Sequence, residues 1–446
     1  MAGKSFLHYI KQKYPNSVYP GDEYGGAAGT SGHGLPTGDS SNFMFATGIE
    51  CSYPTVEHGK LRRDELEECG HYEHWREDLR LVKELGLKVL RYGLPYYKIH
   101  RGEGRYDWDF ADHAMAEIKR LGITPILDLM HFGVPDWLGN YQNPELPLHF
   151  AAYTEAVAKR YPWVRYYTPI NEIYVTARVS AKDGLWNEQL KSDRGFVTAM
   201  KHLVAASIMG TQRIAKHRPD AIIVQSESAE YIHEACAEPS AEITLKNKLR
   251  FLALDLLYAH PPDADVCMYL LDHGMTREEY NWFMAGEPPG YQVMGNDYYG
   301  RNEKILKPDG SMCQAEDVFG WYEITKEYYN RYRKPVMHTE TNTFDPDYAP
   351  TWLWKQWVNV LRMRADGTPV LGFTWYSLTD QIDWDVELTK KLGHVDPVGL
   401  YDLQRRPRPV AAAYRELLKE FGHVTIVPHG EIFQITDRPA TLKVEV

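Results

Sequence analysis

The amino-acid sequence predicts an α/β protein built as a closed (β/α)8 barrel, the TIM-barrel fold, with a short N-terminal arm and a small C-terminal β appendage. Eight apolar, strand-like runs alternate with segments of helical spacing. Alternating strands and helices imply a parallel sheet, and eight such units are the number that closes into this barrel. A doubly wound open sheet is the alternative, but no Gly-rich nucleotide loop follows the first run.

The expected strands are short and rich in β-branched and aromatic residues, as strands usually are. Between them, residues 109–121 have helical spacing behind Asp109, the expected N-cap. Residues 72–85 show the same spacing, and Gly86 marks the expected end of that helix. The eight expected strands are 43–49, 88–92, 123–130, 164–170, 221–225, 292–296, 335–338 and 370–375.

The chain divides into three expected parts. Residues 1–41 form the N-terminal arm and a loop rich in Gly and Ser, and residues 42–422 form the barrel. Residues 423–446 contain two runs of alternating polarity, which predict a C-terminal β extension.

Composition restricts the classes of function. A formal net charge of −11 without a long basic run argues against a nucleic-acid-binding protein. No apolar run reaches the about 18 residues of a membrane-spanning helix, and the N-terminus lacks the apolar segment of a signal peptide. The five cysteines are far apart and form no CxxC pair, so neither disulfides nor a zinc site is indicated. We therefore expect a cytoplasmic protein without metal or cofactor, and the oligomeric state stays open.

Polar and aromatic side chains recur at the C-terminal ends of the expected strands, where active sites form in this fold. The fourth run ends at Asn171 and Glu172, and the seventh delivers Glu340. Two carboxylates across a barrel mouth can cleave a glycosidic bond, since one protonates the leaving oxygen and the other meets the oxocarbenium-like carbon. The same end carries further polar residues and rim aromatics suited to stacking on a sugar: Arg91, His131, Trp137, Asp297, Tyr298, Tyr299, Trp375, Tyr376 and Trp384.

These motifs resemble glycoside hydrolases of the retaining clan A, most closely family 1, the β-glucosidase-like enzymes. The resemblance extends from about residue 43 to residue 421 and rests on nine strings in the family's order. The strings are "FMFATG", "HYEHWREDLRLVKELGLKVLRYG", "GEGRYDW", "LGITPILDLMHFGVPDWL", "YTPINE", "NDYYG", "HTETN", "WYSLTDQIDW" and "VGLYDLQRRPRPVAAAYREL".

The resemblance implies double displacement on a small-molecule β-glycoside, with water or another acceptor receiving the sugar. Glu172 would be the general acid/base and Glu340 the nucleophile. A cationic Arg91 beside Glu340 would keep that carboxylate ionised, whereas Glu172 has no such partner in its motif and can hold a proton. The resemblance also implies supporting roles: Asn171 binding a sugar 2-hydroxyl, Arg91 and Tyr299 holding Glu340, and His131 contacting a hydroxyl.

Two departures from the family pattern lie beside the expected catalytic residues. Ile173 follows Glu172, where the family usually has Pro, and Asp297 stands where Asn is usual. The string "TETN" around Glu340 replaces the family's Thr-Glu-Asn-Gly, so the turn that follows differs.

Other departures concern the residues that grip the sugar. The family's first-strand Gln has no clear counterpart, and Glu50 or Tyr53 in "GIECSYP" can substitute for it. Tyr376 replaces a rim Trp, and Asp383 replaces a Glu that binds the distant hydroxyls, while Trp384 is kept. We therefore expect β-glycoside cleavage on a substrate other than a plain glucoside.

Two further hypotheses stay open. One is a metal-dependent sugar isomerase or lyase on the same barrel, with ligands from Asp128, His131, Glu172, His338 and Glu340. The other is a carbohydrate-binding protein that has lost activity. A last pair of carboxylates, Glu227 and Glu230, follows the fifth run. They can reach the site and contact a polar or cationic sugar, but we favour the interpretation that they belong to a solvated loop.

Overall fold

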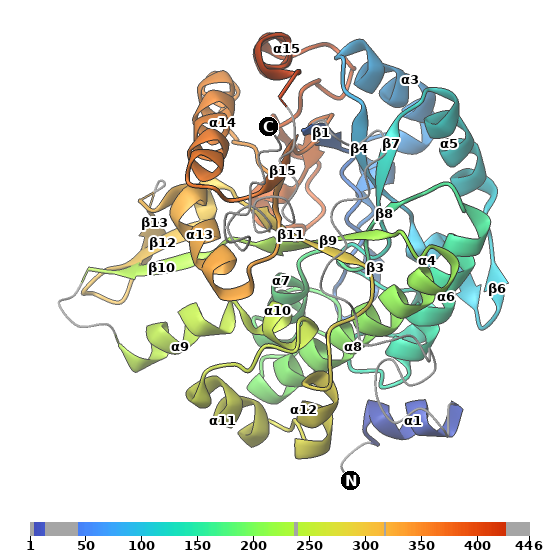
Figure 1. Ribbon diagram of the computed structural model, residues 1–446, viewed down its shortest axis with the longest axis vertical. Coiled ribbons are helices and arrows are strands. Elements are labelled where there is room, and N and C mark those ends of the chain that lie inside the picture. Colours follow the sequence, from blue (N-terminus) through green and yellow to red (C-terminus); the bar gives the residue numbers. More distant parts are fainter. Residues whose placement is uncertain (1–3, 14–42, 236–239, 316–317, 425–446) are drawn as a thin grey trace, which may run out of the picture.

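A computed structural model describes residues 4–13, 43–235, 240–315 and 318–424, and it confirms the barrel (Figure 1). The strands form one closed sheet in the order β1-β15-β14-β11-β9-β8-β7-β4, and every neighbouring pair is parallel. The barrel strands are β1 (Met44–Gly48), β4 (Val89–Gly93), β7 (Thr124–Asp128), β8 (Tyr166–Thr168), β9 (Ile222–Ser228), β11 (Tyr291–Asp297), β14 (Val336–Glu340) and β15 (Val370–Trp375).

All eight predicted strands are present. The predicted end of the fifth strand, β9, was wrong. Strand β9 continues three residues past the predicted end at Gln225. Its last residues are polar, which suggested a loop, but Ser226, Glu227 and Ser228 pair in register with β11 and are buried. Polar residues at the end of a buried strand require partners inside the protein.

Helices surround the barrel and cover the outer face of its sheet (Figure 1). Helix α5 starts at Asp109, and Trp108 is the N-cap, so the predicted cap was one residue too late. Gly86 follows α3 with a φ of 89°, a conformation that glycine adopts without strain. The helices are α1 (Phe6–Lys13), α2 (Glu65–Glu68), α3 (His71–Glu84), α4 (Tyr96–Ile99), α5 (Asp109–Arg120), α6 (Leu146–Arg160), α7 (Ile173–Ala177), α8 (Asp193–His217), α9 (Ala241–Leu249), α10 (Leu252–Leu257), α11 (Ala264–Asp272), α12 (Arg277–Phe283), α13 (Gly320–Tyr332), α14 (Ala349–Ala365) and α15 (Pro409–Phe421).

Segments that follow the C-terminal ends of the barrel strands form small sheets and short helical turns. These segments lie at the end of the barrel where the predicted site residues fall. The strands are β2 (Thr55–Val56), β3 (Leu61–Arg62), β5 (His100–Gly102), β6 (Arg105–Tyr106), β10 (Tyr231–Glu234), β12 (Glu303–Leu306), β13 (Met312–Gln314), β16 (Gln381–Ile382) and β17 (Val395–Asp396); the turns are η2 (Asp136–Leu138), η3 (Arg178–Lys182), η4 (Gly300–Asn302) and η5 (Trp384–Val386).

Part of the predicted N-terminal arm is the helix α1, which packs against the barrel's outer helices. Phe6 is buried, with its ring edge-on to His202 of α8 at 5.9 Å and to Trp282 of α12 at 5.5 Å. The predicted Gly/Ser-rich loop and, beyond Val424, the predicted C-terminal β extension lie outside the described residues. Within the described ranges, no helix combines the length and the apolar character needed to cross a membrane.

Candidate active site

A cavity of about 450 Å³ opens at the C-terminal end of the barrel. Both predicted catalytic carboxylates, Glu172 and Glu340, line it. Its walls carry many charged and aromatic side chains. The other lining residues are Glu50, His131, Phe132, Val175, Arg178, Val179, Asp183, Trp186, Ser228, Glu230, Tyr299, Arg301, Asn302, Lys304, Gln314, Phe344, Tyr376, Gln381, Trp384, Asp385 and Glu387.

Arg91 lies beneath the cavity and is only 2% exposed. Its Nη1 forms an ion pair with Glu340 Oε1. Its Nη2 donates to Asn171 Oδ1 at 3.0 Å and to Asp128 Oδ2 at 3.2 Å. A guanidinium presents its donors in a fixed planar fork, so one buried side chain orients three others.

Glu340 receives a hydrogen bond on each carboxylate oxygen. The Tyr299 hydroxyl donates to Oε2 at 2.6 Å, and Arg91 binds Oε1. Burial and the neighbouring Glu340 raise the pKa of Tyr299 well above its usual value, so the phenol keeps the proton that it donates. Together a cation and a neutral donor stabilise the negative charge of Glu340.

Glu172 lies in a different environment, although it faces the same cavity. The ion pairs found among the described residues do not include it. Burial raises the pKa of Glu172 well above the usual carboxyl range, and the neighbouring carboxylates of Asp297 and Glu340 raise it further. A carboxyl group in such a place holds its proton at a pH where an exposed one has lost it.

Asn171 and His131 complete the network around Arg91. Because Asn171 Oδ1 accepts from Arg91, the Asn171 amide N–H faces His131 Nε2 at 3.1 Å. His131 Nε2 therefore accepts, and its Nδ1 donates to Asp128 Oδ2 at 2.9 Å. Asn171 itself is fully buried and does not line the cavity, whereas His131 does. A sugar hydroxyl at His131 would share Nε2 with the Asn171 amide.

Of the two candidates for the family's first-strand Gln, only Glu50 lines the cavity. Its Oε1 accepts from the backbone N–H of Ser52 at 2.9 Å, and its Oε2 accepts from Gln381 Nε2 at 3.1 Å. The Tyr53 hydroxyl instead accepts the backbone N–H of His131 at 3.1 Å, away from the cavity. Tyr376 and Trp384 line the cavity as predicted.

Three other predicted sugar contacts lie outside the cavity and have protein partners. The Ser226 hydroxyl donates to the Asp297 carboxylate and lies 2.7 and 2.8 Å from its two oxygens. The Trp375 indole donates to the backbone carbonyl of Val398 at 3.0 Å. Asp383 is fully buried, so as a direct sugar ligand it is corrected together with Asp297, Trp375 and Tyr53, which are buried as well. The predicted rim residue Trp137 is exposed and is not among the residues that line the cavity.

Asp383 shows why a sequence position alone does not give a role. Its side chain accepts from Arg63 Nη2 at 2.9 Å and from the backbone N–H groups of Leu392, Gly393 and His394 at 2.7–3.0 Å. These bonds occupy both carboxylate oxygens. Asp383 therefore holds the loop that follows the last strand, and its burial keeps it out of contact with a sugar hydroxyl.

The positions of Glu227 and Glu230 differ from the favoured interpretation of a solvated loop. Glu227 is 1% exposed and lies within β9, so it does not belong to a solvated loop. Glu230 lies between β9 and β10 and lines the cavity, as the alternative interpretation expected. Glu230 accepts from Arg178 at 2.9 Å, and Arg178 also binds Asp183 at 3.0 Å. Arg178 was missed because the segment after Glu172 carries no recognisable motif. The aromatic lining residues Phe132, Trp186 and Phe344 were missed for the same reason.

The ligand set of the metal hypothesis is not assembled. His338 is fully buried, and its ring stacks on Trp321 at 4.5 Å between centroids. Burial lowers the pKa of His338 to about 3. Its side chain packs among the outer helices rather than in the cavity with Glu172 and Glu340.

Comparison with known proteins supplies the decisive observation. The family model described as "Glycosyl hydrolase family 1" matches residues 26–261, more than half of the chain. The chain belongs to glycosyl hydrolase family 1. This family 1 member is therefore a glycoside hydrolase of β-glycosides, and the resemblance drawn from its motifs is confirmed.

Individual relatives of this family 1 member are distant. β-Glucosidase A of Thermotoga maritima is 22% identical over 76% of this chain and 83% of the relative. The 6-phospho-β-glucosidase of Clostridium longisporum is 23% identical over 73% of this chain and 79% of the relative. The solved structure of the Thermotoga maritima β-glucosidase with castanospermine has a TM-score of 0.71 at 18% identity, over 85% of this chain and 97% of that one. At that identity the structural likeness shows the shared barrel.

Proposed function

We propose that this family 1 enzyme is a retaining β-glycosidase with Glu340 as nucleophile and Glu172 as general acid/base. The observation that carries the proposal is the difference between the two carboxylates in one cavity. Arg91 and Tyr299 bind the two oxygens of Glu340, whereas burial and nearby negative charge favour a protonated Glu172. Pairs of carboxyl groups whose environments separate their pKa values take acid and base roles.

The proposed chemistry proceeds in two displacements. In the first, a Glu340 oxygen attacks the anomeric carbon, the bond to the leaving oxygen breaks, and Glu172 gives that oxygen its proton. The sugar is then covalently bound to Glu340. In the second, Glu172 removes a proton from water as the water oxygen attacks the anomeric carbon, and Glu340 leaves with its bonding electron pair. Both carboxyl groups return to their starting states.

The substrate that we propose is a β-glycoside other than a plain glucoside. Two sugar-gripping positions support this proposal. Glu50 places a carboxylate at the cavity wall where the family has a neutral amide. The Asp383 carboxylate accepts hydrogen bonds from the backbone N–H groups of residues 392–394. A site whose polar groups match different hydroxyls discriminates strongly between sugars.

Kinetics of variants on an activated aryl β-glycoside test the proposed roles. Glu340→Ala should lower kcat by about 10⁴-fold or more. Glu172→Ala should lower it less, and azide should restore turnover and yield a β-glycosyl azide, because azide attacks the covalent intermediate without a general base. Glu73→Ala, on the exposed face of α3, serves as a control that azide should not affect. Full activity of the Glu340 variant would refute the assignment.

A hydrolysis screen tests the substrate proposal. It uses aryl β-glycosides of gluco, galacto, xylo, fuco, glucurono and rhamno configuration. We expect the highest kcat/KM for a configuration other than gluco. Highest activity on the glucoside would refute this part of the proposal and leave the catalytic roles untouched, whereas tight sugar binding without turnover of any member would favour a binding protein.

A further inference from the structure

The backbone of Glu172 adopts a conformation that requires support. Its φ is 40° and its ψ is 62°, in the left-handed region that residues with a Cβ rarely occupy. Glu172 is the N-cap of the short helix α7, and no side-chain capping bond comes from Glu172 itself. The direction in which its carboxyl group enters the cavity depends on these two angles, so a neighbouring group must hold them.

Glu227 on β9 supplies that support. Its Oε1 accepts the backbone N–H of Ile173 at 3.0 Å, and its Oε2 accepts the backbone N–H of Tyr174 at 3.2 Å. These are the first two N–H groups of α7, which a helix cannot satisfy internally. The Gln225 side chain donates to Glu227 Oε1 at 3.1 Å and so fixes the carboxylate in turn.

The same segment of β9 binds the chain on both sides of Glu172. Gln225 Nε2 donates to the carbonyl of Ile170 at 2.9 Å, and the backbone N–H of Glu172 donates to the carbonyl of Ser226 at 2.9 Å. The regular pairing of β8 with β9 ends earlier, at Tyr167. Residues 225–227 therefore continue the contact between the two strands up to the expected acid/base.

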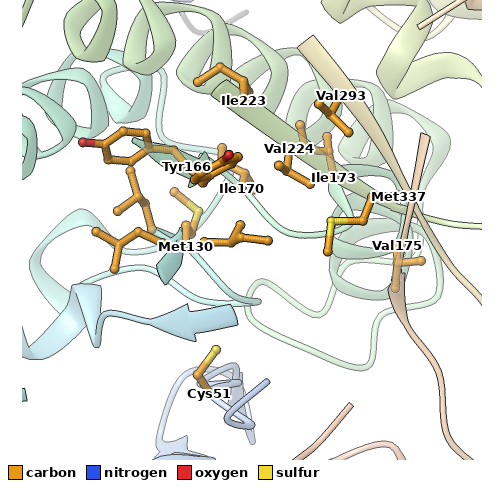
Figure 2. Close-up of a cluster of buried hydrophobic side chains, with 14 of the residues drawn as sticks. Cys51, Met130, Tyr166, Ile170, Ile173, Val175, Ile223, Val224, Val293 and Met337 are labelled. Atoms are coloured by element: carbon orange, nitrogen blue, oxygen red, sulfur yellow. The ribbon is translucent and has the colours of Figure 1, made fainter. Parts of the chain in front are cut away.

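Ile173, the residue that replaces the family's Pro, takes part in this arrangement twice. Its N–H is one of the two that Glu227 accepts, and Pro has no such group. Its side chain is fully buried in the hydrophobic cluster that Figure 2 shows, together with Ile170 and Val224. At this position the family has the rigid ring of proline, whereas Ile173 contributes a backbone hydrogen bond and a side chain packed in the core.

We propose that Glu227 is the positioning residue of the acid/base Glu172, acting through the backbone N–H groups of Ile173 and Tyr174. Glu227 is 1% exposed and does not line the cavity, so it does not touch the substrate. It holds the backbone that directs the Glu172 proton toward the leaving oxygen. This inference rests on the proposed role of Glu172.

Dependence on the leaving group separates positioning of the acid from general loss of structure. A dinitrophenyl glycoside needs no proton to leave, whereas an alkyl or phenyl glycoside does. In Glu227→Ala, kcat/KM should fall about 10- to 100-fold more for the phenyl glycoside than for the dinitrophenyl glycoside of the same sugar. Glu227→Gln keeps the shape and one acceptor oxygen, so it should show the same preference to a smaller extent.

A matched control is Glu279→Gln. Glu279 is also a buried carboxylate at the start of a helix, α12, and it accepts the backbone N–H of Thr276 at 2.8 Å. It lies outside the cavity lining, so its replacement should change both substrates by the same factor. Glu172→Ala, measured in parallel, should show the strongest preference for the dinitrophenyl glycoside.

The outcomes distinguish the two proposals. Equal losses on both substrates in the two Glu227 variants, with a strong preference in Glu172→Ala, would overturn the positioning role and leave the proposed function intact. Absence of any preference in Glu172→Ala would overturn the acid/base assignment and with it the role of Glu227. A preference in the Gln variant supports the proposal even where the Ala variant does not fold.

Discussion

Arg91 on β4 forms an ion pair with Glu340 on β14, although these strands are not neighbours in the closed sheet. The contact crosses the barrel interior and joins residues that are 249 positions apart. Because Arg91 also binds Asn171 and Asp128, it connects β4 with the ends of β7 and β14 and with the segment that follows β8, at the base of the cavity.

Tyr299→Phe removes the hydroxyl that donates to Glu340 Oε2 at 2.6 Å. A hydrogen bond to a charged group contributes about 1.5–3 kcal/mol, so we expect kcat/KM to fall about 10- to 100-fold. Tyr298→Phe is the matched control, since the hydroxyl of this neighbouring residue donates to Glu303 at 2.6 Å instead. Equal kinetic effects of the two substitutions would contradict a role for the Tyr299 hydroxyl at the nucleophile.

Asp297→Asn restores the residue that is usual in the family and removes a negative charge near Glu172. That charge raises the pKa of Glu172, so the substitution should lower it. The general acid works when protonated, and activity is lost as pH rises through its pKa. The alkaline limb of kcat/KM should therefore move to lower pH, which a pH–rate profile measures. Asp255→Asn, a buried site paired with Arg331, should leave the limb in place.

Glu50→Gln replaces the carboxylate at the cavity wall by the amide that the family uses. A carboxylate that is ionised only accepts hydrogen bonds, whereas an amide also donates to a sugar hydroxyl. We expect kcat/KM on an aryl β-glucoside to rise about tenfold, the effect of one hydrogen bond. Glu230→Gln changes another cavity carboxylate, one paired with Arg178, and should give no such gain. A decrease for Glu50→Gln would show that this carboxylate suits the glucoside.

The buried carboxyl group of Glu188 should make the free energy of unfolding depend on pH. Burial raises its pKa from 4.5 to about 7, and its Oε2 has no hydrogen-bond partner among the described residues. Between these pH values the unfolded chain releases a proton that the folded chain keeps, so the free energy of unfolding falls as pH rises. The loss is complete above about pH 7 and is on the order of 3 kcal/mol.

Urea unfolding at pH 5 and pH 8 measures this contribution. Glu188→Gln removes the titrating group, so its stability should decrease less between the two pH values than that of the wild type. Glu73→Gln, at an exposed position on α3, should follow the wild type. An identical pH dependence of Glu188→Gln and wild type would contradict the prediction.

Short-range sequence patterns were sufficient to predict the strands, the helices and the barrel that they form. Alternating strand and helix periodicities predicted the barrel, and the strand ends predicted that Glu172 and Glu340 face one cavity. Both follow from short segments, because a strand's direction and its carboxyl end are readable within a few residues.

Predictions failed where a side chain's partner lies far away in the chain. For Glu227 the favoured interpretation was a solvated loop, yet it accepts an N–H from a residue 54 positions away. Asp383 matched a sugar-binding position, yet it binds Arg63, 320 positions away. The sequence alone determined the barrel and which carboxylates stand at its mouth. Only the tertiary structure decided which polar groups face the cavity, because a buried polar group is satisfied by whatever donors the fold brings to it.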